Sequence, residues 1–359
     1  MDYYSMSSHT NISIQTTTTP TQVSGSPGVE ENLNVTCYVV QDFGLLFDTA
    51  DMFLNCFLIH ALSFFGIFGN IINIIVLSHH GFKDTTNIIL TSLSTSDLLY
   101  SLVTPARRLK CVISQFNIPL STTVESITTA FLFAPSVTLI AISMCHITLI
   151  AVERLIAVSL PFHVSRLFTT SRVKRTVFIV YFIVIVMSSP VFMRLSYEWV
   201  KDEFYNAYVA VVINTRFYQD NLNVVDTYSV GFLNMLFSVF TLIIILFCSF
   251  VIIVKLRSEF YKKQITRSMD SSKSKLKEMK VFKMLLTVCL VSAVVWVPTA
   301  VLDMLQIYGD GLARTDGFSY LAQSVNCVLY QFSCSVNFVI YVTTSSKFSA
   351  TYRHLFKLR

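Results

Sequence analysis

The segment Ser126–Val158, SITTAFLFAPSVTLIAISMCHITLIAVERLIAV, decides the fold of this chain, because it runs apolar for more than twenty residues before its first charge, Glu153. The hydrocarbon core of a bilayer is about 30 Å thick, and a helix needs roughly 20 mostly apolar residues to span it. The whole chain agrees: its 359 residues are 53% hydrophobic and 13% charged, against about 25% charged in soluble domains. The pattern therefore predicts a membrane protein.

Six further apolar stretches have the length of a membrane span, which predicts an all-α bundle of seven transmembrane helices. No internal repeat is visible, and we expect no second domain beside the bundle, which covers residues 52–342. The predicted spans are Phe53–Ser78, Asn87–Leu109, Ser126–Val158, Thr176–Met193, Ser229–Val254, Val281–Tyr308 and Tyr320–Val342.

The segment before the first span, residues 1–51, is rich in Ser and Thr and has no apolar stretch of signal-peptide type. We expect it to be disordered, so that the first span acts as its own insertion signal. Two glycosylation sequons begin at Asn11 and Asn34. The last residues, 343–359, predict a short amphipathic helix whose basic side chains meet anionic lipid headgroups.

The distribution of Lys and Arg predicts the orientation, because cytoplasmic loops are enriched in both. Residues 1–51 contain neither, so we expect the N-terminus outside and the C-terminus in the cytoplasm of a multi-pass plasma-membrane protein. A net charge of +6 does not indicate nucleic-acid binding here, because the basic residues are spread over short loops. The cytoplasmic cations include Arg166, Arg172, Lys174, Arg175, Lys255, Arg257, Lys262, Lys263, Arg267 and Lys280.

Polar motifs inside the spans come in a fixed order. Burying such residues in lipid is costly, so each needs a partner or a function. The motifs are Gly69-Asn70, LSTSDLL around Asp97, Glu153-Arg154-Leu155, Pro161 in the following loop, Trp296-Val297-Pro298 and Asn337-Phe338-Val339-Ile340-Tyr341.

Over residues 52–358 these motifs resemble those of the rhodopsin-like, class A, G protein-coupled receptors. The resemblance implies a receptor without enzymatic activity that binds an extracellular ligand and activates a heterotrimeric G protein. A seven-span transporter would need paired charges at midplane, and an intramembrane hydrolase would need His and carboxylates around a metal. Neither arrangement is visible, and no Cys or His spacing indicates a metal site.

The resemblance also implies a sodium pocket, in which a hard cation takes oxygen ligands. No other cofactor is expected. The alternative is a hydrated polar cluster without an ion. The implied pocket residues are Asn70, Asp97, Ser143, Ser333 and Asn337.

At the cytoplasmic end, the resemblance implies a switch that consists of Glu153, Arg154, Glu278 and Tyr341. Arg154 paired with Glu278 would hold the sixth helix inward, and the alternative is that Glu278 is one solvated charge among lysines. Pro298 removes a backbone hydrogen bond and should kink the sixth helix, which would let that end swing outward.

Three residues complete the activation core that the resemblance implies: Trp296 beneath the ligand, Pro298 at the kink and Asn337 in the last motif. Phe338 replaces the family's usual proline and Phe250 a common tyrosine, so we expect a divergent member. No Trp marks the fourth span.

The ligand residues are predicted at the outer ends of the spans. Ser136 replaces the aspartate of amine receptors and Gln331 the retinal lysine of opsins, which argues against both ligand types. We expect a peptide or an environmental chemical, as for invertebrate peptide-type or chemosensory receptors. Asp303 selects a basic group or is simply a solvated helix-end acid. The predicted contacts are Ser136, Trp296, Asp303, Gln306, Gln323, Asn326 and Tyr330.

The cysteines depart from the family, which usually bridges the third span to the second outer loop. Thr129 stands at the first of these positions, and the outer loop from Arg194 to Asp226 has no Cys. Cys37 and Cys111 are both expected outside and could form a substitute disulfide, or Cys37 could be free. We interpret the other cysteines, Cys56 included, as small packing residues within spans.

Overall fold

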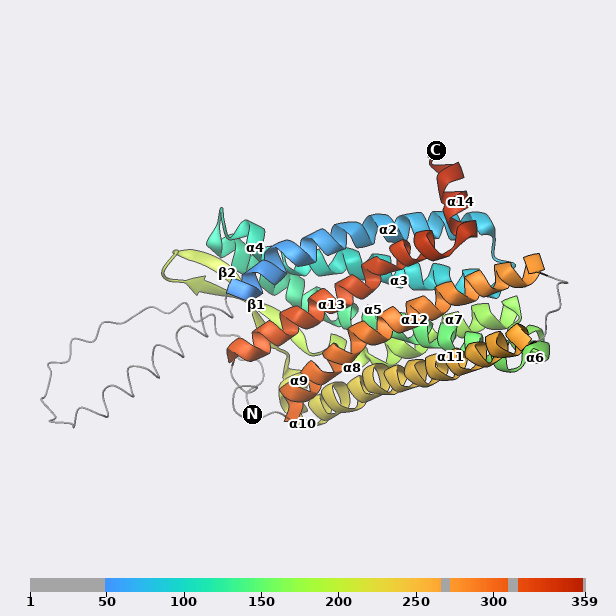
Figure 1. Cartoon of the computed structure of the whole chain (residues 1–359). Helices are drawn as coiled ribbons and strands as arrows, with labels where there is room; N and C mark the ends of the chain where they lie inside the picture. The colour runs from blue at the N-terminus through green and yellow to red at the C-terminus, as the bar shows by residue number, and fades with distance from the viewer. Residues whose placement is uncertain (1–48, 266–271, 309–315, 358–359) are drawn as a thin grey trace, which may run out of the picture.

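Seven long helical segments lie side by side in the computed structural model, which describes residues 49–265, 272–308 and 316–357 (Figure 1). This arrangement confirms the predicted seven-helix bundle. In chain order the segments are η1 with α2 (Leu54–Leu58, Ile59–His80), α3 (Thr85–Arg107), α5 (Ile118–Ser159), α7 (Thr170–Met187), η2, η3 and α11 (Thr227–Leu233, Met235–Phe240, Thr241–Ile265), α12 (Ser272–Tyr308) and α13 (Asp316–Thr344).

Short elements mark the two ends of the bundle. One end carries the β-hairpin and is called the hairpin end; the other carries α14, which turns away from α13, and is called the α14 end (Figure 1). The short elements are α4 (Lys110–Ile113), α6 (Pro161–Leu167), α8 (Ser189–Phe192), β1 (Leu195–Asp202), β2 (Ala207–Asn214), α9 (Arg216–Asp220), α10 (Leu222–Asp226) and α14 (Ser346–Leu355).

Five of the seven segments are long and apolar enough, by length and composition, to cross a membrane. The other two, α3 and α7, are more polar for identifiable reasons. Helix α3 is rich in Ser and Thr and contains Asp97, whereas α7 carries Arg172, Lys174 and Arg175 within 18 residues. Helix α3 lies inside the bundle against α2, α5, α7 and α13, so protein rather than lipid surrounds its polar face.

Apolar side chains form both the interior and the outer surface of the bundle. Leu93, Ile147 and Leu285 are at most 1% exposed and belong to one core shared by α3, α5 and α12. Phe65 and Phe178, by contrast, are 67% and 72% exposed on the outside. So much exposed aromatic surface is unsuited to water, and lipid covers it in a multi-pass membrane protein.

The turn between α2 and α3 is short and well defined. Gly81 adopts φ +81°, a region that L side chains rarely enter. Asp84 then caps α3 by accepting a hydrogen bond from the Thr86 backbone N–H at 3.1 Å. This start places two threonines, Thr85 and Thr86, in the first turn of α3 at the α14 end.

The predicted outer loop folds into an antiparallel hairpin, pairing Leu195 with Asn214 at its base and Asp202 with Ala207 near its tip. The hairpin packs on α5. The Ala210 backbone N–H donates to Thr123 Oγ1 at 3.2 Å, and the hairpin is held without the family's usual disulfide.

Polar contacts close the base of the hairpin. The Arg194 guanidinium lies 3.3 Å from the Asp226 carboxylate and donates to the Tyr218 hydroxyl at 2.7 Å. That hydroxyl in turn donates to Asp226 at 2.8 Å. Because all three groups are linked, this cluster joins the start of β1 to the start of the fifth span.

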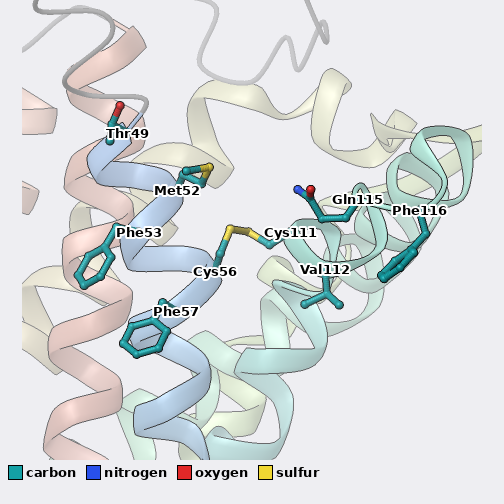
Figure 2. Close-up of a pocket in the computed structure, with 9 residues that line it drawn as sticks. All are labelled: Thr49, Met52, Phe53, Cys56, Phe57, Cys111, Val112, Gln115 and Phe116. Carbon is teal, nitrogen blue, oxygen red and sulfur yellow. A yellow bond between two sulfur atoms is a disulfide. The ribbon is translucent and has the colours of Figure 1, made fainter.

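The disulfide predicted between Cys37 and Cys111 is wrong, because Cys111 is bonded to Cys56 (Figure 2). Cys56 lies in η1 and Cys111 in α4, and their Cα atoms are 5.3 Å apart. Helices α2 and α3 pack along their length, which brings these two ends together. Placing Cys56 inside a span led to its interpretation as a packing residue, whereas it sits in the outermost turns.

Candidate functional site

The Asp97 carboxylate is fully buried near the middle of α3, where two neighbouring helices donate to it. Ser143 Oγ, from α5, donates to Asp97 Oδ1 at 2.7 Å, and Asn337 Nδ2, from α13, donates to Oδ2 at 2.8 Å. A buried carboxylate needs such partners, because its desolvation is costly. The structure thus brings three of the five predicted pocket residues together.

The remaining two pocket residues are buried but are used differently. Asn70 Nδ2 donates to the backbone carbonyls of Gly66 and Cys334, each at 2.9 Å, and so links α2 to α13. Ser333 is buried one turn before Asn337 on α13. Asn70 therefore joins helices rather than donating to Asp97.

At the α14 end, Arg154 is half-buried and its guanidinium is bonded within the bundle. Its Nη2 lies 3.1 Å from Glu153 Oε2 and donates to Thr86 Oγ1. Glu153 Oε1 accepts from Thr85 Oγ1 at 2.9 Å and from Thr86 Oγ1 at 3.3 Å. The network ties the end of α5 to the start of α3. The two threonines are partners that the motif search missed.

The other two predicted switch residues lie on α12 and α13. Glu278 belongs to α12, but its side chain is outside the part of the chain whose side chains the structure describes, so its pairing with Arg154 stays a prediction. Tyr341 is fully buried, its ring centroid lies 5.6 Å from that of Phe348 of α14 with the two rings tilted, and its hydroxyl has no hydrogen-bond partner among the described residues. Phe250 is 66% exposed and faces away from this interior.

The activation core lies near the middle of α12. Trp296 is 4% exposed and its ring centroid lies 4.9 Å from that of Tyr330 on α13. Pro298 interrupts the helical hydrogen bonding, and the buried Thr299 hydroxyl donates to the Trp296 carbonyl at 2.8 Å. The carbonyl that Pro298 leaves without its helical partner is that of Val294, four residues earlier, so the Thr299 bond is a separate contact beside the kink.

Phe338, which replaces the usual proline, packs against Gly69 of α2. A Cβ on Gly69 would lie 2.9 Å from the Cβ of Phe338, closer than real Cβ contacts come. Only glycine therefore fits at position 69 in this packing, and the first and last spans approach closely there. The Phe338 ring also contacts Tyr352 of α14 at 5.7 Å.

At the hairpin end, the surroundings of Ser136 were not predicted. Ser136 is 2% exposed and its hydroxyl accepts a hydrogen bond from Arg107 Nη1 at 2.8 Å. The Arg107 guanidinium also lies over the Phe133 ring, 5.2 Å from its centroid. A cation from α3 thus stands where the family's amine receptors place an anion.

The other predicted ligand residues lie on α12 and α13. Asn326 Nδ2 donates to Asp303 Oδ1 at 2.8 Å, so the Asp303 carboxylate already has an amide partner. Gln323 is half-buried. The side chain of Gln306 falls outside the described residues, as do Asn11, Asn34 and Cys37.

A polar bridge also links the second, third and fourth spans. His146, fully buried on α5, has Nε2 2.8 Å from Ser92 Oγ and Nδ1 2.7 Å from the Ile142 carbonyl. The Tyr181 hydroxyl of α7 donates to the Ser92 carbonyl at 3.2 Å. Both ring nitrogens of His146 have protein partners and neither partner is a carboxylate, which is unlike a hydrolase triad.

A separate apolar groove of about 640 Å³ surrounds the disulfide (Figure 2). Met52, Phe53 and Phe57 line one side of it, with Val112 and Phe116 on the other. None of the predicted ligand residues lines this groove, which lies beside η1 rather than among the helices that carry Ser136 and Trp296.

Comparison with known families gives one match. Residues 69–341 match the model of the family described as 7 transmembrane receptor (rhodopsin family). This range covers more than half of the chain and includes every motif from Gly69 to Tyr341. No curated protein shows significant similarity to the chain.

Proposed function

Because the chain belongs to the rhodopsin family of seven-transmembrane receptors, we propose that an extracellular ligand bound at the hairpin end activates a heterotrimeric G protein through outward movement of α12 at the α14 end. Family membership makes the protein a multi-pass plasma-membrane receptor that signals through G proteins. The ligand class and the helix movement are the parts that we propose.

The observation that carries the mechanism is the bonding of Arg154. Its side chain is 15% exposed and is held by Glu153 and Thr86. A half-buried guanidinium of this kind can change partners when a neighbouring helix moves, because each of its bonds is worth only a few kcal/mol at most. Movement of α12 would free Arg154 to contact the G protein.

Glu278 is the second part of the switch. We place its carboxylate against Arg154 in the inactive state, where the pair would restrain α12. Pro298 supplies the hinge, since its ring removes one helical hydrogen bond. Trp296, two residues before Pro298 and in contact with Tyr330, would transmit ligand contact to the hinge.

For the ligand, we propose a peptide or an environmental chemical. The support is the hairpin, whose exposed aromatics Trp199, Phe204 and Tyr208 offer contact area of the kind that peptides and apolar molecules bind. Ser136, Asp303, Asn326, Gln323, Gln306, Trp296 and Tyr330 remain the proposed contacts within the bundle.

A sodium ion is proposed in the Asp97 pocket. The donor set fits a hard cation, because Asp97 and Ser143 supply oxygen atoms. A second observation is Ser94, one turn before Asp97, which is fully buried and whose hydroxyl has no partner among the described residues. A bound cation would compensate the buried charge of Asp97 and favour the inactive packing.

Nucleotide exchange tests the proposed function. Membranes of cells that express the chain are combined with each class of heterotrimeric G protein and with peptide and odorant libraries. We expect at least one library member to raise exchange above that in membranes without the chain. If no G protein class and no library member gives such a rise at verified surface expression, the proposed function fails.

A further inference from the structure

Two consecutive arginines at the hairpin end of α3 turn into the bundle. Arg107 is the last residue of α3 and Arg108 caps it. Because successive helical residues point about 100° apart, the two side chains reach different neighbours. Arg107 contacts Ser136 of α5 at 2.8 Å, whereas Arg108 Nη2 contacts the Cys327 thiol of α13 at 3.4 Å. Two guanidinium groups therefore reach into the interior from one turn of helix.

Four acidic residues at this end bond to residues other than Arg108. Glu125 pairs with Lys110 at 2.6 Å, and Asp226 pairs with Arg194 at 3.3 Å. Asp303 accepts from Asn326, and Asp51 accepts from Ser324. Among the residues that the structure describes, no carboxylate lies within 4 Å of the Arg108 guanidinium.

A thiol sulfur is a poor partner for this group. A guanidinium carries five N–H donors in a planar fork and cannot be deprotonated in a protein, whereas a thiol is a weak acceptor. The Arg108 guanidinium is half-buried, and among the described residues no carboxylate contacts it directly, so a contact with a carboxylate would offset more of its desolvation cost. An incoming carboxylate would accept two parallel N–H bonds from such a fork, which is the strongest arrangement for this pair.

We propose that Arg107 and Arg108 bind an acidic group of the ligand, specifically a carboxylate. This inference rests on the proposed function, since it names the chemical class recognised by the ligand site of the receptor. The carboxylate belongs either to a small organic acid or to the free C-terminus of a peptide. Phe133, under the Arg107 guanidinium, and the Trp296–Tyr330 pair offer aromatic surface for the rest of such a ligand.

The test uses matched pairs that differ only in charge. The full chain is purified in lipid nanodiscs, and its thermal unfolding midpoint is measured with phenylacetate against phenylacetamide and octanoate against octanamide. A peptide arm compares phenylalanine-terminated tetrapeptides with free and with amidated C-termini. We expect the acid of at least one pair to raise the midpoint more than its amide, with an affinity at least tenfold higher. The arm that responds identifies the source of the carboxylate.

Variants assign the effect to the two arginines. Arg107→Gln and Arg108→Gln should each remove the difference between acid and amide, and Arg108→Lys, which keeps the charge but loses the planar fork, should retain only part of it. Arg216→Gln is the matched control, because it removes an exposed cation at the start of α9 on the same end. Acid and amide are compared within each variant, so the difference in unfolding midpoint can be measured even in a variant of lower stability.

Two outcomes overturn the proposal: no acid in either arm exceeds its amide, or the difference survives in both Arg107→Gln and Arg108→Gln. If a Gln variant does not fold, acid and amide binding are compared in Arg107→Lys and Arg108→Lys instead. The assay contains no G protein. A failure of nucleotide exchange would therefore contradict the proposed signalling but not the carboxylate site. Equal binding of acids and amides would contradict the carboxylate site but not the proposed signalling.

Discussion

The two ends of the bundle differ in the partners of the arginines that reach into the interior. At the α14 end, Arg154 meets Glu153, its neighbour in the family motif, and Thr86 of α3. At the hairpin end, Arg107 donates to the Ser136 hydroxyl, at the position where amine receptors carry an aspartate. In the proposed function the α14 end meets the G protein and the hairpin end meets the extracellular ligand, so the two arginines would serve different partners.

The largest expected effect tests the α14 end. Arg154→Ala should abolish nucleotide exchange on the G protein, because no other described cation is held by Glu153 and Thr86 there. Exchange is measured at matched surface expression, with Arg166→Ala in the same cytoplasmic half as the control. Full nucleotide exchange in Arg154→Ala would contradict the proposed role of the α14 end in contacting the G protein.

The next prediction tests the hairpin end through its covalent link. Cys56→Ser should lower the stability of the receptor by roughly 2 kcal/mol, since removing a native disulfide typically costs 2–5 kcal/mol and the unfolded chain in a membrane is already restricted. Thermal unfolding in nanodiscs measures it, with Cys145→Ser as the control for loss of a free thiol. Cys111→Ser should match Cys56→Ser and the double variant should add nothing; additive losses would argue against the pairing.

A smaller effect is expected from the restraint on α12. If the free receptor is about 1% active, losing about 1.4 kcal/mol of restraint raises the active fraction roughly tenfold. Glu278→Gln should therefore raise basal exchange by about that factor without changing ligand selectivity. Lys280→Gln, a charge change two residues along the same helix, is the control. Equal basal exchange in wild type and Glu278→Gln would refute the pairing with Arg154.

Thr86 should give a weaker version of the same effect. Thr86→Val removes the hydrogen bonds to Arg154 and Glu153, but Glu153 still pairs with Arg154. We therefore expect a loss of only about 0.7 kcal/mol of restraint, half of the 1.4 kcal/mol that corresponds to a factor of ten. We expect basal exchange to rise about threefold. Thr85→Val is the matched control, because Thr85 bonds to Glu153 but not to Arg154, and it should rise less. A greater rise in basal exchange in Thr85→Val would indicate that the restraint depends on Glu153 rather than on Arg154.

The smallest prediction concerns the middle of the bundle, between the two ends. If sodium occupies the Asp97 pocket, raising sodium at constant ionic strength should lower basal exchange in wild type by about twofold, which is weaker than the roughly 5-fold to 150-fold coupling common between allosteric sites. Potassium replaces sodium as the control. Asp97→Asn should remove the difference between the two salts, and its persistence in that variant would place the ion elsewhere.

The sequence predicted the bundle but not the arginine contacts of the hairpin end, for physical reasons. Long apolar stretches identify spanning helices directly, and the Glu153-Arg154 and Trp296-Val297-Pro298 motifs are local in sequence. The contact between Arg107 and Ser136 is not local, because it depends on the rotation of α3 against α5. Two adjacent arginines at the outer end of a span were a visible signal, since cations are sparse on that side, yet their direction needed the structure.

The cysteines show the same limit. A disulfide between Cys56 and Cys111 requires the first span to begin with its Cys at the membrane edge, and span boundaries are the least certain part of a hydropathy pattern. Likewise, the sequence shows Gly69 only as a small residue in a span. Its close packing against Phe338 depends on how the first and last spans pack together.

The position of that disulfide also bears on how the protein is made. Both of its cysteines belong to the first third of the chain, so the ribosome delivers them before the third helix has been synthesised. Disulfides form in the oxidising lumen of the endoplasmic reticulum, where the hairpin end emerges. A bridge from the third span to the second outer loop, by contrast, would have to wait until more than half of the chain is translated. The first two helices of this receptor can therefore be joined covalently as a pair, on which the later helices assemble.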